Sequence, residues 1–168
     1  MSREFTFGSG GLAVTAAPAT TIAWVNPTAA PNMNIEILRM WLSQSANATS
    51  AQQHIQGETQ SSGFPLLAPS APKVLKRADP NISIISTISS GAAGAAGTAG
   101  INASSETAGG KSVIFDDNFN VLNGWLNVPT PPETIVLPAG YLSGFGLFWV
   151  TAPVTLTSWS VGVTFREV

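Results

Sequence analysis

The sequence has no cysteine, only one histidine and few charged residues. Without cysteine the chain can form no disulfide scaffold, no thiolate zinc site and no cysteine nucleophile. Charged residues make up 10% of the chain, whereas an ordinary soluble protein has about 25%. Lysine and arginine together number seven. They are too few to neutralise many phosphates, so the composition excludes a basic nucleic-acid-binding protein.

The sequence is rich instead in hydrophobic residues, which make up 44% of 168 positions, and in small neutral residues. This balance excludes an intrinsically disordered chain, and the length suits a single domain. The most apolar stretch, residues 141–159, is interrupted by glycine, proline and β-branched residues, which argues against a membrane-spanning helix. No apolar segment typical of a secretory signal follows Met1, which predicts synthesis in a cytoplasm.

Hydrophobic residues recur with a period of two, which is the pattern of β-strands. The clearest case is residues 155–168, where one face is predicted to carry Trp159, Val161, Val163 and Phe165. About eight to ten such segments alternate with Gly, Pro and Asn turns, and little helix is expected. The pattern predicts an all-β protein with an antiparallel, jelly-roll-like β-sandwich.

The predicted domain organisation has two parts. Residues 1–11 form either an N-terminal arm or the first strand of the domain, because Phe5 and Phe7 precede a glycine-rich joint. Residues 12–168 form a single β-sandwich domain with long loops near 64–80 and 91–110. An arm of this kind could add a strand to the open sheet edge of a neighbour.

Two segments bear on the strand assignment. Residues 34–43 fit either a helix or a strand, and the strand is preferred, with Ile35, Ile37, Arg39 and Trp41 on one face. Residues 119–128 suggest another strand, with a bulge at positions 123–124.

Residues with catalytic chemistry are scarce. His54 stands in a polar setting, which favours a surface or interface histidine over a general base. Asp116 and Asp117 are expected to point to opposite faces of a strand or to end it in a turn, so a calcium site would require the chain to turn there. The sequence Gly109-Gly110-Lys111-Ser112 lacks the first glycine of a phosphate-binding loop and leads into a strand, which excludes a nucleotide site. No catalytic residue, cofactor or metal is therefore assigned.

The five tryptophans are interpreted mainly as core residues. Trp24, just before a proline-bounded loop, is the best candidate for an exposed or interface aromatic. Small and neutral polar residues occupy positions where charged residues usually stand, and such surfaces are buried at low cost in permanent assemblies. The predicted assembly contacts are Phe5, Phe7, Trp24, Lys73, Lys76 and Arg77.

Several segments resemble a family of small virion proteins of tailed bacteriophages. The most distinctive block joins Phe119-Asn120-Val121, Gly124-Trp125 and Pro129-Thr130-Pro131. Further similarity lies in residues 37–50, 137–140 and 161–167, so the resemblance covers most of the chain after about residue 10. It implies a β-sandwich structural protein and carries no catalytic residues.

The resemblance implies a non-enzymatic capsid decoration (cement) protein on the outer surface of the virion head. Its expected partners are the major capsid protein and further copies of itself, with a trimer favoured, and neither nucleic acid nor membrane. A receptor- or glycan-binding module of a head or tail fibre is the alternative, with Trp24 or Tyr141 as a stacking platform. A hydrolase acting on the host envelope is disfavoured, because the chain has one histidine.

Overall fold

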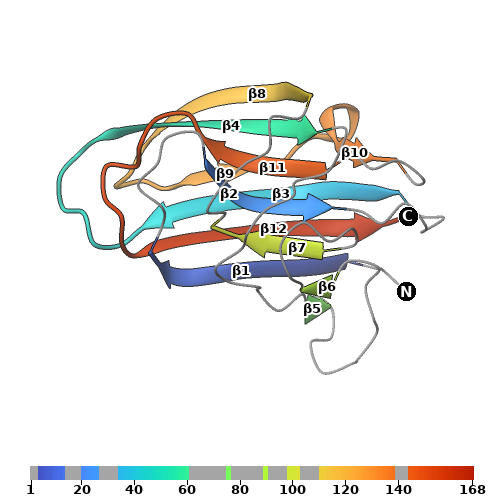
Figure 1. Cartoon of the computed structure of the whole chain (residues 1–168), viewed down its shortest axis with the longest axis horizontal. Coiled ribbons are helices and arrows are strands. Elements are labelled where there is room, and N and C mark those ends of the chain that lie inside the picture. Colours follow the sequence, from blue (N-terminus) through green and yellow to red (C-terminus); the bar gives the residue numbers. More distant parts are fainter. Residues whose placement is uncertain are drawn as a thin grey trace.

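A computed structural model describes residues 4–13, 20–26, 34–60, 75–76, 89–90, 98–102, 110–138 and 144–168. These residues form strands and one short 3-10 helix, arranged as two layered sheets (Figure 1). The fold class predicted from the sequence is confirmed. The elements are β1 (Glu4–Leu12), β2 (Thr20–Asn26), β3 (Ile35–Gln44), β4 (Gln52–Gln60), β5 (Leu75–Lys76), β6 (Ser89–Ser90), β7 (Thr98–Ile101), β8 (Lys111–Asn120), β9 (Trp125–Asn127), η1 (Pro131–Glu133), β10 (Ile135–Leu137), β11 (Gly144–Trp149) and β12 (Trp159–Glu167).

The first sheet has the order β10-β3-β12-β1-β5, with β9 also paired to β3. The second sheet has the order β6-β7-β2-β11-β4-β8. The long-range pairing is nested: β1 pairs with β12, β2 with β11, β3 with β9 and β10, and β4 with β8, all antiparallel. A chain that pairs in this way and alternates between two sheets is a jelly roll.

Alternating side chains of both sheets fill the space between them, as the strand period requires. In β12, Trp159, Val161, Val163 and Phe165 are buried in the core, which confirms the predicted face. The rings of Trp149 and Trp159 pack edge to face at 4.8 Å and join the two sheets.

A β-bulge interrupts β3 and changes which residues face the core. Arg39 pairs with Thr164 and Ile37 pairs with Phe165, so Leu38 is the extra residue. Met40 and Leu42 therefore join Ile35 and Ile37 in the core. The prediction that Ile37, Arg39 and Trp41 share a face is wrong, because a bulge reverses the alternation beyond it.

Strand β8 continues through both aspartates to Asn120. The prediction that Asp116 and Asp117 end a strand is therefore wrong. The bulge expected at positions 123–124 is instead part of the turn between β8 and β9, where Gly124 has a φ of 69°. A positive φ is readily adopted by glycine, which allows this tight connection.

Three aromatic rings lie over glycines of the neighbouring strand. Trp41 faces Gly162, Trp24 faces Gly100 and Phe115 faces Gly57, each as direct cross-strand partners. A Cβ added at any of these glycines would overlap the ring. Because glycine has no side chain, each ring has room to lie against the sheet. Such cross-strand contacts between an aromatic ring and a glycine also help to fix the register of the strands. Residues 98–101 form strand β7, although they fall within the long loop predicted near 91–110, and Gly100 makes a close backbone contact with the Trp24 ring there.

Candidate functional site

Exposed apolar side chains gather around β9 and β10 at one margin of the first sheet. Leu126 is 57% exposed, Val128 59% and Val136 46%. Two of them lie on strands that pair with β3, where Leu126 is opposite Trp41 and Val136 is opposite Glu36. Together with Leu38 and the prolines at positions 129, 131 and 132, these residues are here called the β9–β10 surface. Patches of this kind mark interaction sites in folded proteins.

Two hollows flank the proline-rich segment of this surface. One, of about 430 Å³, opens between β8 and the β9–β10 margin and is lined by Ile114, Val128 and Ile135 among others. The other, of about 520 Å³, lies over the first sheet and includes Leu38, Val136 and Arg166. Pro129 lines both, so the segment forms a ridge between two depressions.

The ridge is held in shape by its own sequence. Prolines at 131 and 132 occupy the first positions of η1, where their fixed φ suits a helical turn. Glu133 donates its backbone N–H to the carbonyl of Thr130 at 2.8 Å. The Thr130 hydroxyl in turn donates to the Glu133 carboxylate at 3.0 Å. A ridge with few free torsions loses little entropy when a partner binds it.

A row of four residues crosses the outer face of the first sheet beside this ridge. Direct partners place Leu126, Trp41, Gly162 and Gly8 side by side on β9, β3, β12 and β1. The indole of Trp41 extends from β3 over the two glycines. The guanidinium of Arg39 lies 5.3 Å from the indole centroid, within cation–π range.

A second row on the same face carries charge. Val136, Glu36, Arg166 and Glu4 are successive cross-strand partners. Arg166 donates from Nε to the Glu36 carboxylate at 3.0 Å, and this hydrogen bond and the carboxylate charge raise the pKa of Arg166. The apolar β9–β10 surface is thus bordered by an internally paired set of charges.

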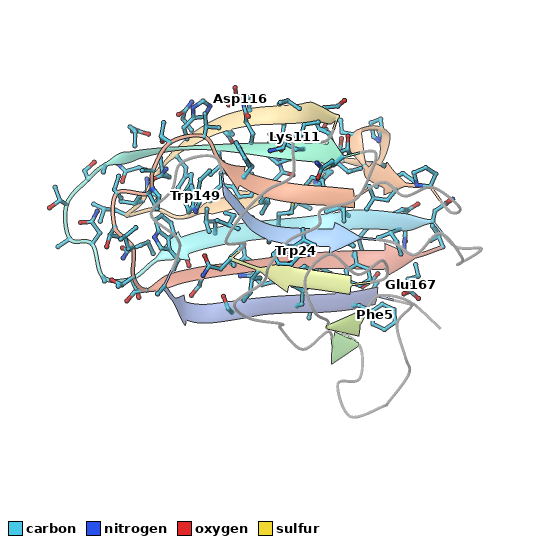
Figure 2. All side chains as sticks on the ribbon, viewed as in Figure 1. Phe5, Trp24, Lys111, Asp116, Trp149 and Glu167 are labelled. Carbon is cyan, nitrogen blue, oxygen red and sulfur yellow. The ribbon has the colours of Figure 1, made fainter. Side chains whose placement is uncertain are left out.

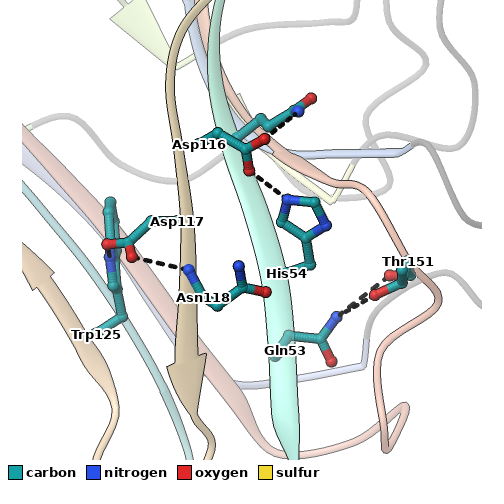
Figure 3. Close-up of polar contacts among 8 residues, drawn as sticks. Gln53, His54, Asp116, Asp117, Asn118, Trp125 and Thr151 are labelled. Carbon is teal, nitrogen blue, oxygen red and sulfur yellow. Dashed lines mark hydrogen bonds and ion pairs between the residues drawn. The ribbon is translucent and has the colours of Figure 1, made fainter.

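The two adjacent aspartates of β8 have different partners (Figure 3). Asp116 contacts the His54 ring and accepts a hydrogen bond from Gln56 at 3.1 Å, both on β4. Asp117 accepts a hydrogen bond from the Trp125 indole at 2.7 Å. Because the carboxylates are directed to opposite sides of the strand, they share no ligand geometry, as expected for neighbours on a strand.

The pair of His54 and Asp116 is the nearest approach to a catalytic arrangement in the described ranges. The hydrogen bond from His54, followed by that from Gln56, lowers the pKa of Asp116 below its ordinary value. His54 and Asp116 both lie at the surface, with 29% and 51% of their side chains exposed. Over the same residues, no group of three or more His, Asp or Glu side chains is close enough to hold a metal ion.

Three of the predicted assembly contacts lie inside the protein. Phe5 and Phe7 belong to β1 and are buried against Phe165. Residues 4–12 are thus the first strand of the sandwich, and the arm is ruled out for them. Trp24 is 1% exposed and covers Gly100, so its prediction as an exposed or interface aromatic is wrong. Figure 2 labels Phe5 and Trp24 on the ribbon. An alternating pattern shows which side chains share a face of a strand. It does not show whether the outer face of a sheet is covered by other parts of the protein.

Of the three predicted cationic contacts, Lys76 alone is among the described residues. Lys76 lies in β5, where it pairs with Phe5. Lys73, Arg77 and Tyr141 lie outside the described residues.

Sequence reasoning missed the residues of the β9–β10 surface as contacts. One signal was present, because the block resembling phage virion proteins includes Pro129 and Pro131 of this surface. No family model, curated protein or solved structure matches this chain. The resemblance to phage virion proteins therefore stays a prediction. In the described part of the chain, no helix has the length and apolar character needed to cross a membrane.

Proposed function

We propose that this protein is a non-enzymatic structural subunit of a tailed-phage virion, namely a capsid decoration (cement) protein. The observation that carries the proposal is the β9–β10 surface, where Leu126, Val128 and Val136 are exposed beside a rigid proline ridge. Such a surface has the apolar centre and polar rim of a protein–protein interface. The jelly-roll fold is compatible with this role but does not establish it, since one fold supports many functions.

The proposed partner of this surface is the assembled major capsid protein on the outside of the head. A subunit that binds neighbouring capsid proteins only when they are assembled stabilises the shell by mass action. The low charge of the chain supports this role, because little charge must be desolvated on binding. Association of the chain into homo-oligomers would increase its avidity for a symmetric shell.

The test uses heads from a phage that encodes this chain and from which its gene has been deleted. Purified protein is added back, located by cryo-EM and assayed for its effect on the temperature at which heads release DNA. Leu126→Asp and Val136→Asp are expected to weaken head binding at least about tenfold, since each buries an unpaired charge in the interface. Val154→Asp is the matched control, because Val154 is also exposed but lies on the β11–β12 connection, bonded to Gln53 of the second sheet.

Two outcomes would contradict the proposal. One is location of the protein only at the tail. The other is head binding that Leu126→Asp and Val154→Asp weaken equally, which would place the interface elsewhere.

A receptor- or glycan-binding module remains the second candidate, and Trp41 now supports it in place of Trp24. Its half-buried indole lies on the outer face beside Arg39, and an aromatic ring with a nearby polar group is a common element of binding sites. Glycan-array binding that is lost in Trp41→Ala and kept in Trp41→Phe would favour this candidate. Absence of binding to any glycan would count against it.

A further inference from the structure

Strand β8 is a long edge strand with one paired side. Within the described ranges it pairs only with β4, and its ten residues form the margin of the second sheet (Figure 1). Strands β5, β6, β9 and β10 at the other margins have two or three residues each. An edge of this length exposes backbone donors and acceptors that can pair with another strand.

The middle of this edge is apolar and exposed. Val113 is 53% exposed and Ile114 43%. Gly57 pairs with Phe115 and Glu58 with Val113, so Ile114 is the extra residue of a β-bulge. Ile114 also lines the hollow of about 430 Å³, which leaves apolar space next to the edge.

Opposite charges flank this apolar centre. Lys111 stands before it, where it pairs with Glu58 of β4 at 3.5 Å. Asp116 stands after it and bonds to His54 and Gln56, which also belong to β4. Because His54, Gln56 and Glu58 are alternate residues of one strand, Lys111 and Asp116 project on the same side of the sheet.

We propose that β8 pairs antiparallel with β8 of a second copy of this chain, about a two-fold axis between Val113 and Ile114. In this register, Lys111 of each copy lies opposite Asp116 of the other, and the exposed apolar residues meet at the axis. Directly opposed charges of opposite sign stabilise such pairs. The interface is isologous, so each contact occurs twice.

The bulge makes this register possible. Residues directly opposite each other in paired strands lie on the same face of the sheet. Lys111 and Asp116 are five positions apart, so in a regular strand they would lie on different faces and could not be opposed. Because the bulge adds Ile114 between them, Lys111 and Asp116 lie on the same face of the sheet. A register centred near Asp117 would instead bring aspartates together, which disfavours it. The charges and the bulge therefore discourage indiscriminate edge pairing while allowing one specific partner.

The occupant is a second copy because the edge is complementary to itself in charge order. The resulting unit is a dimer, not the trimer that the resemblance implies. This inference does not depend on the proposed capsid role, because a monomeric protein could still bind heads, and a dimer could exist without binding them.

The experiment measures the mass of the full chain in solution by sedimentation equilibrium over a concentration series. The expected result is a monomer–dimer equilibrium whose dissociation constant rises at least about tenfold in Ile114→Asp. Val154→Asp is the control, since Val154 has the same 43% exposure and lies on the β11–β12 connection beside Gln53, at the other end of β4 from Glu58, the partner of Val113. Circular dichroism and thermal unfolding check that each variant remains folded.

A second variant tests the register itself. The chain has no cysteine, so Ile114→Cys introduces one thiol close to the proposed axis. Mild oxidation is expected to give a reducible covalent dimer, and Val154→Cys is expected to remain monomeric under the same conditions. A monomer at every concentration, a trimer, or a dimer that Ile114→Asp does not weaken would overturn the proposal. Failure of Ile114→Cys to cross-link a confirmed dimer would overturn the register.

Discussion

The indole of Trp41 covers the backbone of Gly162 on the neighbouring strand, in the space where a side chain would otherwise stand. The contact joins β3 to β12 on the outer face of the first sheet. It also fixes the ring whose edge borders the β9–β10 surface. Gly162, a residue without a side chain, therefore affects both the strand pairing at the centre of the sheet and the shape of its outer face.

Gly162→Ala is expected to destabilise the protein by about 1–3 kcal/mol, because the added methyl overlaps the indole and forces it to move. In a Trp41→Ala background the same substitution should be neutral, or stabilising by up to about 1 kcal/mol, since alanine restricts the unfolded chain. A double-mutant cycle by urea unfolding measures the difference. Equal costs in both backgrounds would show that the ring and the glycine are not coupled.

The two aspartates of β8 should differ in their effect on stability. Asp117→Ala removes the acceptor of the Trp125 indole N–H and should lower the free energy of unfolding by about 1 kcal/mol. Asp116→Ala removes contacts at the surface and should cause a smaller loss. Urea unfolding of both variants gives the comparison, with Trp125→Phe as a check on the same hydrogen bond. An equal or larger loss in Asp116→Ala would contradict the assignment.

The pKa of Asp116 should lie below its ordinary value of 3.8 and should rise in His54→Ala, because the hydrogen bond from His54 is its largest cause. NMR titration of the carboxyl carbon measures both values. Since the folded pKa is lowered, the contact stabilises the protein above the ordinary pKa and is lost as the pH falls through the lowered value. An unchanged midpoint in His54→Ala would rule out this contact in solution.

Gln53 anchors the connection between β11 and β12 from inside the protein. Its buried amide donates to the carbonyl and hydroxyl of Thr151 (Figure 3). It also accepts a hydrogen bond from the backbone N–H of Val154 at 3.1 Å. Gln53→Met keeps a similar shape but leaves these groups without partners, and should cost about 1–3 kcal/mol.

Hydrogen exchange provides the local readout for Gln53. The amide of Val154 should exchange faster in Gln53→Met, whereas the amide of Val163 in the central strand β12 should change only as far as global stability falls. Unchanged protection of Val154 would show that the connection is held by other contacts.

Much of the fold is predictable from local sequence. Period-two alternation predicts the strands of the sandwich and the inward face of β12, because neighbouring side chains of a strand point to opposite sides. The candidate surface was only indirectly visible, through the proline-rich block that now lines both hollows.

The sequence by itself determined that this is an all-β chain with little charge, since alternation and composition are properties of the residues alone. Only the tertiary structure decided that Leu38 forms a bulge, that Trp24 is covered and that Trp41 is not fully so. It also brought His54 to Asp116 and placed Leu126 beside Trp41. These relationships depend on which strands become neighbours and in what register, and backbone pairing between distant segments is not encoded in the local period of either one.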